Sequence, residues 1–186
     1  MNTYKTVDAS RISISELMLP SHSNFSGKIH GGYILGLMDQ IAFACASKHS
    51  KTYCVTASVD TVDFLAPIEV GELVTMKASI NYVGRTSMVV GIRVEAEHIQ
   101  SGKIKHCNSS YFTMVAKNEA GQSMEVPGLI LNDKQEVKRF LKALKRNDMK
   151  KQRRLEFDHQ NFSLKDYLGE LENYKVKIEL PDNYNN

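Results

Sequence analysis

Cysteine, proline and tryptophan are scarce in this chain, whose 186 residues include three cysteines, four prolines and no tryptophan. Cys45, Cys54 and Cys107 are odd in number and widely spaced, and none belongs to a CxxC pair. This pattern argues against a disulfide framework or a zinc ribbon and favours buried cysteines that act as small apolar side chains. The six histidines lack metal-ligand spacing such as HExxH, so we expect no metal site.

Long apolar runs are also missing. The longest, at residues 31–46, is too short and too interrupted to cross a bilayer, and the first eleven residues lack the apolar core of a signal peptide. With 42% hydrophobic and 24% charged residues, the composition is that of a soluble globular protein. We therefore expect a cytoplasmic protein without membrane contact, built as one domain with an extension.

The run GGYILGLMDQIAFACA predicts a helix from residue 32 to about residue 48. Its apolar side chains fall on nearly every face, as in a helix that is buried all round. Asp39 lies near the middle, and the run contains no basic residue. Because burying an unpaired carboxylate is costly, we expect Asp39 to reach a polar cavity or an interface.

Strand-like segments surround this helix. One precedes it and four longer ones, rich in β-branched residues, follow it: 11–19, 53–67, 73–83, 87–99 and 104–116. The links between the last four are short enough for hairpins.

The strand expected at 87–99 alternates apolar residues with polar residues and a glycine, so one of its faces is apolar. The order of the segments predicts an α+β fold in which one curved antiparallel sheet wraps a long central helix. The sheet covers one side of that helix, and we expect a second subunit to cover the rest.

The loop before the helix, 20–32, offers groups that would complement a base at Asp39. Asn24 carries an amide, and His30, Gly31 and Gly32 lead into the helix N-terminus. Free backbone N–H groups and the positive end of the helix dipole lie there, and glycine lets a ligand approach the backbone closely. Such a terminus can hold a carbonyl oxygen, while a partly desolvated carboxylate is a stronger base than one in water.

Three segments occur in order along the chain: NFSGKIHGGYILGLMDQIA, VTASVDTVDFLAPIEVGE and VGRTSMVVGIRVE. Together they resemble the hot-dog-fold acyl-CoA thioesterases, in particular the acyl-CoA hydrolase group that includes the bacterial YciA-type enzymes and the brain cytosolic acyl-CoA hydrolase. The resemblance covers residues 8–118 without a large gap. It implies a hot-dog domain at 1–125 and leaves a helical C-terminal extension at 126–186.

The resemblance also implies roles for single residues. Asp39 matches the family's catalytic aspartate, and Asn24 matches an asparagine that acts from the partner subunit. Gly32, with Gly31 before it, matches the glycine pair whose backbone N–H polarises the thioester carbonyl. The implied reaction is hydrolysis of acyl-CoA to a free fatty acid and CoA, with the aspartate as base or nucleophile.

Further residues are expected to contact the substrate. They include His30 and Gly31 at the helix start. The turn that matches the family's pantetheine and nucleotide contacts adds Gly84, Arg85, Thr86 and Ser87. Arg93, on a strand, is a cation suited to phosphate. No cofactor is implied, because CoA is part of the substrate and product. The resemblance implies a homodimer at least, and a hexamer built as a trimer of dimers.

Two other functions share this fold. A non-catalytic sensor of acyl-CoA would lack a catalytic acid, and the presence of both Asp39 and Asn24 argues against it. A hot-dog dehydratase or hydratase pairs a histidine with an acid on the helix, yet no histidine occurs in the helix before His49.

The net charge of +3 is unevenly distributed. Residues 1–132 contain eleven basic and eleven acidic side chains, whereas residues 133–160 contain ten basic and five acidic ones. The segment 132–157 has helical composition, and a second short helix, capped by Ser163, is expected at 161–172. No aromatic residues interleave with the basic ones, so we expect no nucleic-acid binding, and favour packing over a neighbouring subunit or near the nucleotide of CoA.

Overall fold

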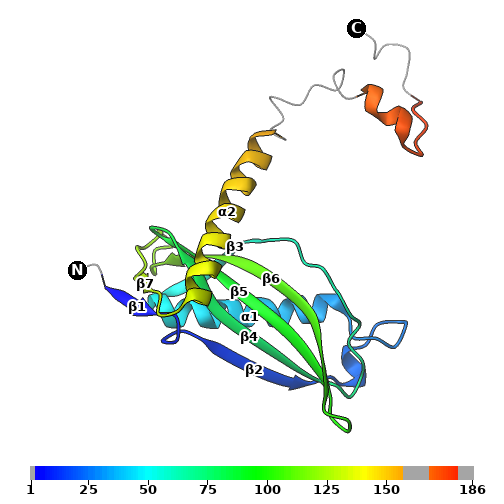
Figure 1. Ribbon diagram of the computed structural model, residues 1–186, viewed down its shortest axis with the longest axis horizontal. Helices are drawn as coiled ribbons and strands as arrows, with labels where there is room; N and C mark the ends of the chain where they lie inside the picture. The colour runs from blue at the N-terminus through cyan, green and yellow to red at the C-terminus, as the bar shows by residue number, and fades with distance from the viewer. Residues whose placement is uncertain (1–2, 157–167, 180–186) are drawn as a thin grey trace. The chain divides into compact units, whose positions relative to one another are not determined.

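The computed structural model describes residues 3–156 and 168–179 (Figure 1). In chain order the elements are β1 (Tyr4–Thr6), β2 (Ile12–Leu17), the 3-10 helix η1 (Pro20–His22), α1 (Gly31–Ser50), β3 (Tyr53–Val59), β4 (Leu73–Val83), β5 (Ser87–His98), β6 (Lys103–Lys117), β7 (Gly128–Ile130), α2 (Lys134–Glu156) and the 3-10 helix η2 (Leu168–Asn173).

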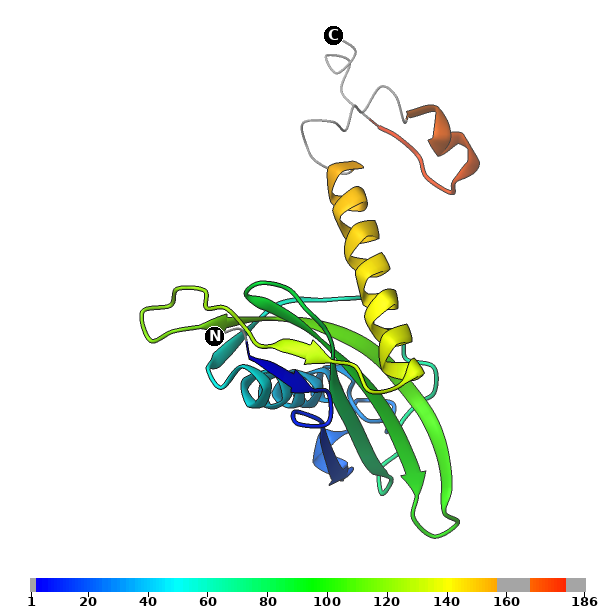
Figure 2. The same ribbon diagram turned by 60° about the vertical axis from the view of Figure 1, so that its left-hand side comes forward.

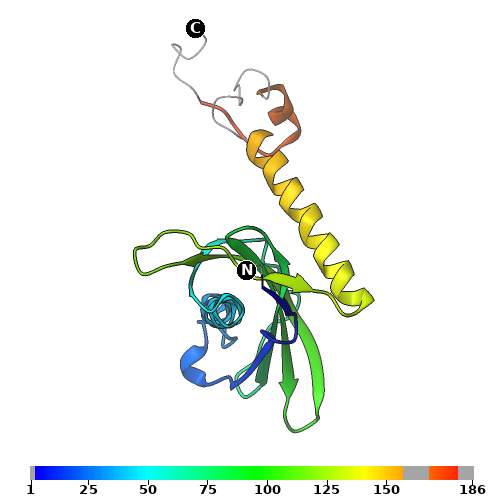
Figure 3. The same cartoon turned by 90° about the vertical axis from the view of Figure 1, so that its left-hand side faces the viewer.

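The main sheet contains five strands in the order β2-β4-β5-β6-β3, and every neighbouring pair is antiparallel. It curves around α1, which Figure 3 shows nearly end-on. The predicted α+β architecture, one curved antiparallel sheet around a long helix, is therefore confirmed. The strands expected at 73–83 and 87–99 match β4 and β5 to within one residue.

The segment at 53–67 differs from the expectation. It is a strand only as far as Val59, and residues 60–67 form no regular element. β3 does not pair with β4 as a hairpin would. It lies at the sheet edge beside β6, with Tyr53 opposite Lys117. The prediction of a hairpin-sized link was wrong because the whole segment 60–72 carries the chain from this edge back to β4.

One side of α1 packs on the sheet. The fully or largely buried residues of the helix recur at helical spacing and form a single stripe: Ile34, Met38, Ile41, Ala42, Cys45, Ala46, His49 and Ser50. The opposite side exposes Asp39, Gln40 and Phe43. The exposed fraction of Phe43 is 39%. The expectation of a helix buried all round was therefore wrong for the single chain, and the apolar residues of the second face are left uncovered.

β1 and β7 form a second, two-stranded parallel sheet (Figure 2). Val126 and Leu129 pack against the hydrophobic core, so the chain continues in the same compact unit beyond residue 125. That unit runs from Met1 to Leu144, and a second unit comprises residues 145–186. The division between these two compact units falls within α2, and a domain boundary near residue 125 stays a prediction.

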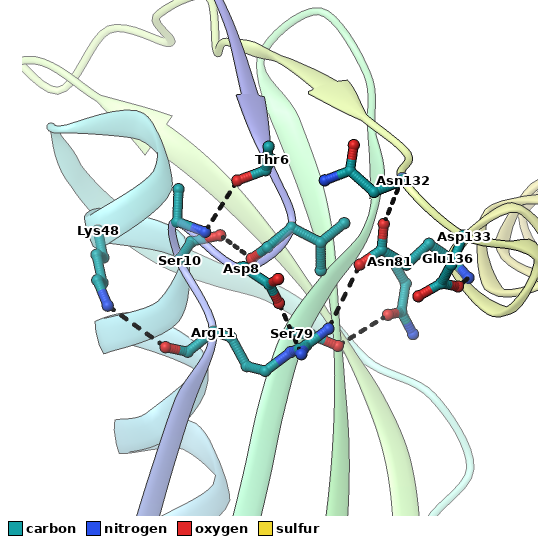
Figure 4. A network of polar contacts seen from close by, with 12 residues as sticks. Thr6, Asp8, Ser10, Arg11, Lys48, Ser79, Asn81, Asn132, Asp133 and Glu136 are labelled. Atoms are coloured by element: carbon teal, nitrogen blue, oxygen red, sulfur yellow. Dashed lines mark hydrogen bonds and ion pairs between the residues drawn. The ribbon is translucent and has the colours of Figure 1, made fainter.

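The start of α2 is capped by acidic side chains. Asp133 Oδ1 accepts a hydrogen bond from the Glu136 N–H at 2.8 Å, and Glu136 Oε2 accepts one from the Asn132 N–H at 2.8 Å (Figure 4). The Asp133 contact satisfies an N–H group that a helix end leaves free, and α2 confirms the helix expected at 132–157. Ser163, the expected cap of the next helix, lies outside the described residues. No helix among those residues is long and apolar enough to span a membrane.

His49 is buried where α1 meets the N-terminal segment and the chain before β7. Its Nδ1 lies 3.3 Å from Ser10 Oγ, and its Nε2 lies 3.1 Å from the Pro127 carbonyl oxygen. Burial lowers the pKa of His49 below its usual value, and the Pro127 contact offsets only part of this effect. The folded state therefore favours the neutral form of His49, whereas in the unfolded chain His49 takes up a proton at its ordinary pKa.

This difference predicts an acid-sensitive stability. The free energy of unfolding should be fully retained above about pH 6.5 and should fall as the pH falls through the lower folded-state pKa of His49. Urea denaturation at pH 7.5 and pH 5.5 measures it. His49→Gln, which can still donate to Pro127, should flatten the pH dependence, while His98→Gln at an exposed site should leave it unchanged. Equal pH dependence in wild type and His49→Gln would contradict the assignment.

Candidate active site

Asp39 lies on the exposed side of α1, beside the edge strand β3. Its Oδ1 accepts a hydrogen bond from Thr56 Oγ1 at 2.5 Å, and the same hydroxyl lies 3.4 Å from Met114 Sδ. The sheet covers only the other side of the helix, so Asp39 is exposed in the single chain, and its expected place at a polar cavity or an interface stays a prediction. Sequence reasoning also missed Thr56, since a threonine in a β-branched strand carries no signal that distinguishes it from its neighbours.

The N-terminus of α1 is capped by His30. The Gly32 N–H donates to His30 Nδ1 at 2.9 Å, so this ring nitrogen carries no proton. A Cβ at position 32 would lie 2.9 Å from the imidazole, and one at position 31 would lie 3.1 Å from the Phe64 ring. A side chain at position 32 would therefore displace the His30 ring, and one at position 31 would need a small shift of the Phe64 ring. The Gly32 N–H is already engaged, contrary to the expectation of a free donor, whereas Gly31 opens the helix, and its N–H has no intrahelical acceptor.

Asn24 organises the loop that precedes the helix. Its Oδ1 accepts three hydrogen bonds, from Ser26 N at 2.9 Å, Ser26 Oγ at 2.7 Å and Lys28 N at 3.2 Å. The Lys28 ammonium then pairs with Glu69 at 2.6 Å. Because the amide oxygen is used within the loop, the NH2 group is the part of Asn24 that remains to contact a ligand.

The helix N-terminus and Asp39 lie too far apart to act on one carbonyl within a single chain. Eight residues separate Gly31 from Asp39, which is about 12 Å along the helix axis. A general base and an oxyanion donor must each lie within hydrogen-bond reach of the reacting atoms, about 3 Å. A site that uses both groups therefore needs two chains, with the N-terminus of one α1 facing the middle of another.

The turn between β4 and β5 lies level with Asp39 across the sheet. Thr56 of β3 and Met88 of β5 both pair with Met114 of β6, so the turn before Met88 is two strand spacings, about 10 Å, from Thr56. The Gly84 N–H donates to the Ser87 carbonyl at 2.7 Å, which closes the turn.

The carbonyls of the two central residues tie this turn to neighbouring segments. The Arg85 carbonyl accepts a hydrogen bond from Val126 N, and the Thr86 carbonyl accepts one from Ala116 N, both at 3.0 Å. The Arg85 side chain is exposed. The turn residues predicted from the sequence therefore lie at the same height along the strands as the Asp39 carboxylate.

Arg93 lies elsewhere. Its neighbours in β5, Ile92 and Val94, are buried among the residues packed around α1, so Arg93 points to the opposite face of the sheet. There its Nε donates to Glu95 Oε1 at 2.7 Å. The structure thus does not bring Arg93 together with Asp39 of its own chain.

Within the described part of the chain, the cysteines and acidic groups form no metal cluster. Across residues 3–156 and 168–179, no group of three or more His, Cys, Asp or Glu side chains is placed to hold a metal ion. Burial raises the pKa of Cys45 to about 12, so its thiol stays protonated and is a poor ligand or nucleophile.

Comparison with known proteins agrees with this geometry. Residues 26–103 match the thioesterase superfamily. Protein VdlD of Helicobacter pylori is 43% identical over 80% of this chain and 84% of its own length. A hexameric acyl-CoA thioesterase without ligand has 34% identity and a TM-score of 0.79 over 81% of this chain and 97% of its own.

A second solved structure shows a ligand-bound relative. It is an acyl-CoA hydrolase from Staphylococcus aureus in complex with butyryl-CoA and CoA, with 30% identity and a TM-score of 0.78 over 89% of this chain and 99% of its own. Further structures of the same hydrolase contain single replacements of an aspartate, a threonine or an asparagine by alanine.

A curved antiparallel sheet around one long helix is the hot-dog fold of the thioesterases that this chain matches. The chain belongs to the thioesterase superfamily, within its acyl-CoA thioester hydrolases.

The cap at the helix start gives a stability prediction. His30→Ala removes the acceptor of the Gly32 N–H and should lower the free energy of unfolding by about 1 kcal/mol. His30→Asn supplies another capping oxygen and should retain most of it. Urea denaturation of both variants checks this, with equal stability of His30→Ala and wild type as the contradicting result.

Proposed function

We propose that this chain hydrolyses acyl-CoA thioesters to a free fatty acid and CoA, as a homodimer or as a hexamer built from three dimers. Its membership in the acyl-CoA thioester hydrolases and the match to a hydrolase that binds butyryl-CoA support the reaction class. The hexameric thioesterase of similar fold supports the assembly. CoA enters as part of the substrate rather than as a cofactor, and the cytoplasm remains the proposed location.

One observation supports the catalytic residues most directly. The asparagine, aspartate and threonine replaced in the S. aureus hydrolase follow one another at intervals of 15 and 17 residues. Asn24, Asp39 and Thr56 of this chain have the same intervals, and Thr56 donates to the Asp39 carboxylate. Agreement in residue type and in both intervals supports these three residues as the counterparts of the altered ones.

The proposed mechanism uses two subunits. The thioester carbonyl lies against the α1 N-terminus of one subunit, where the helix dipole and the Gly31 N–H stabilise the developing oxyanion. Gly32 contributes to the same terminus once a ligand displaces its contact with His30. Asn24 directs its NH2 group at the water or the carbonyl.

Asp39 of the other subunit removes the proton from the attacking water. Thr56 holds its Oδ1, which leaves Oδ2 for this proton. Water oxygen bonds to the carbonyl carbon, and the C–S bond then breaks as CoA leaves as a thiolate. A covalent anhydride between Asp39 and the acyl group is the alternative route. Hydrolysis in oxygen-18 water during a single turnover separates the two, since label in the Asp39 peptide would contradict direct attack by water.

The substrate-contact proposals follow the same placement. His30 and Gly31 lie at the helix start, and the turn Gly84, Arg85, Thr86 and Ser87 lies level with Asp39, near enough for pantetheine and phosphate contacts. Arg93 would contact CoA only if the CoA came from another subunit, because it points away from α1.

Asp39→Asn tests the role of the carboxylate. The side chain is exposed and the amide has the same shape, so the variant should fold, while kcat should fall by about a thousandfold because no base remains. Thiol release from a panel of acyl-CoA chain lengths measures the loss.

Binding of CoA by Asp39→Asn should stay close to that of wild type. If wild type binds CoA but releases none from any acyl-CoA, the chain is a non-catalytic sensor, and the proposed reaction is wrong.

Two substitutions of Thr56 test the hydrogen bond that its hydroxyl donates to Asp39. Thr56→Ser keeps the hydroxyl that donates to Asp39 and should retain most activity, whereas Thr56→Val keeps the shape and loses the donor. We expect kcat of Thr56→Val to fall about tenfold with KM little changed. Equal kcat for the two variants would show that the hydrogen bond to Asp39 has no part in the reaction.

A further inference from the structure

The segment between β3 and β4 passes beside the start of α1, and β6 fixes one side of it. The Leu65 N–H donates to the Cys107 carbonyl, and Asn108 Nδ2 donates to the Asp63 carbonyl, both at 2.9 Å. Asn108 is fully buried. All four residues belong to the first compact unit, so the backbone around residue 64 is tied to the main sheet.

The other side of the segment is fixed to the loop that leads into α1. The Ile29 N–H donates to the Ile68 carbonyl at 2.9 Å. The neighbouring residues add an ion pair, because the Lys28 ammonium lies 2.6 Å from the Glu69 carboxylate. The segment is therefore held between β6 and the helix start, and it cannot withdraw from either without breaking hydrogen bonds.

Phe64, in the middle of the segment, directs the tip of its ring at the first residue of α1. A Cβ at Gly31 would lie 3.1 Å from Cζ of the ring, 3.4 Å from Cε2 and 3.7 Å from Cε1. The Phe64 side chain is nevertheless 49% exposed. A large apolar surface therefore borders the helix N-terminus and remains open to a ligand there.

The ring tip is close to the N–H group that the proposed mechanism uses. Backbone and side-chain bonds at Cα are about 1.5 Å long, so Cζ of Phe64 lies within about 6 Å of the Gly31 nitrogen. A carbonyl oxygen that accepts a hydrogen bond from this N–H lies about 3 Å from the same nitrogen. The carbonyl carbon and the atoms bonded to it are therefore within reach of the ring.

We propose that Phe64 is a specificity-determining residue for the acyl group. Its ring packs against the acyl carbon next to the thioester carbonyl and selects unbranched acyl chains over chains with a branch at that carbon. The ring suits the acyl side because this side is hydrocarbon, whereas the CoA side carries amides and phosphates. The role of Phe64 rests on the proposed function, in which the thioester carbonyl lies against the α1 N-terminus.

Crowding by the ring gives this selectivity. An unbranched chain has only hydrogen atoms on that carbon, whereas a methyl branch needs room for one more carbon. Carbon atoms pack best at about 3.5–4.0 Å, and the hydrogen-bonded segment holds the ring in place. A misfit of one methyl group in such a site changes kcat/KM by roughly tenfold or more.

Thiol release from hexanoyl-CoA, 2-methylhexanoyl-CoA and 5-methylhexanoyl-CoA tests this role. Phe64→Ala should raise the ratio of kcat/KM for the 2-methyl compound to that for hexanoyl-CoA by about tenfold over wild type. The branch slows hydrolysis intrinsically to the same extent in both enzymes, so this ratio isolates the effect of the ring. The ratio for the 5-methyl compound should be unchanged, because its branch lies far from the carbonyl.

Three controls separate this role from damage to the segment. Leu65→Ala removes the next apolar side chain, which is 64% exposed, and should leave every ratio within about twofold of wild type. Phe64→Leu keeps an apolar side chain of intermediate size and should give an intermediate ratio. Binding of CoA, which has no acyl chain, should be equal in wild type and Phe64→Ala by calorimetry.

The possible failures are distinct. If wild type hydrolyses hexanoyl-CoA but folded Phe64→Ala and Phe64→Leu keep the wild-type ratio for the 2-methyl compound, or Leu65→Ala changes it equally, the role of Phe64 is overturned and the proposed function stands. Weaker CoA binding by Phe64→Ala would place the ring on the CoA side and overturn its assignment to the acyl group. Release of no thiol by wild type would contradict the proposed function itself, and the role of Phe64 with it.

Discussion

The packing of one side of α1 on the curved sheet determines the rest of the structure. The buried stripe around Met38 and Ile41 holds the helix in the sheet, and this fixes which residues face away from it. Asp39 lies outside this stripe, which recurs every three to four residues, and therefore points to the open side. The same packing leaves Phe43 partly exposed next to an edge strand, a combination of apolar surface and unpaired backbone that a second chain would cover.

The proposed division of the active site between two subunits rests on helix geometry. A helix rises about 1.5 Å per residue, so the oxyanion donors at its start and the carboxylate in its middle cannot meet around one carbonyl. Two antiparallel helices related by a twofold axis bring the start of each beside the middle of the other. The proposed mechanism therefore requires the oligomer. The loop of Asn24 is already tied by hydrogen bonds within its own chain.

Much of the fold could be predicted from the sequence because its signals are local. The alternation in β5 and the apolar run of α1 fixed those elements closely. The position of β3 could not be predicted, since pairing with β6 is a long-range choice that no local pattern encodes. The helix was expected to be buried all round because composition cannot say which side of a helix the sheet will leave open. Thr56 was missed for the same reason: its importance comes from a contact with a residue 17 positions away.

The most direct test of the two-chain site is a crystal structure of Asp39→Asn with an uncleaved acyl-CoA bound. The account predicts that the thioester carbonyl lies within hydrogen-bond reach of the α1 N-terminus of one subunit, and that residue 39 beside it belongs to another. A carbonyl contacted by residue 39 and by the helix start of a single chain, or by neither, would contradict it.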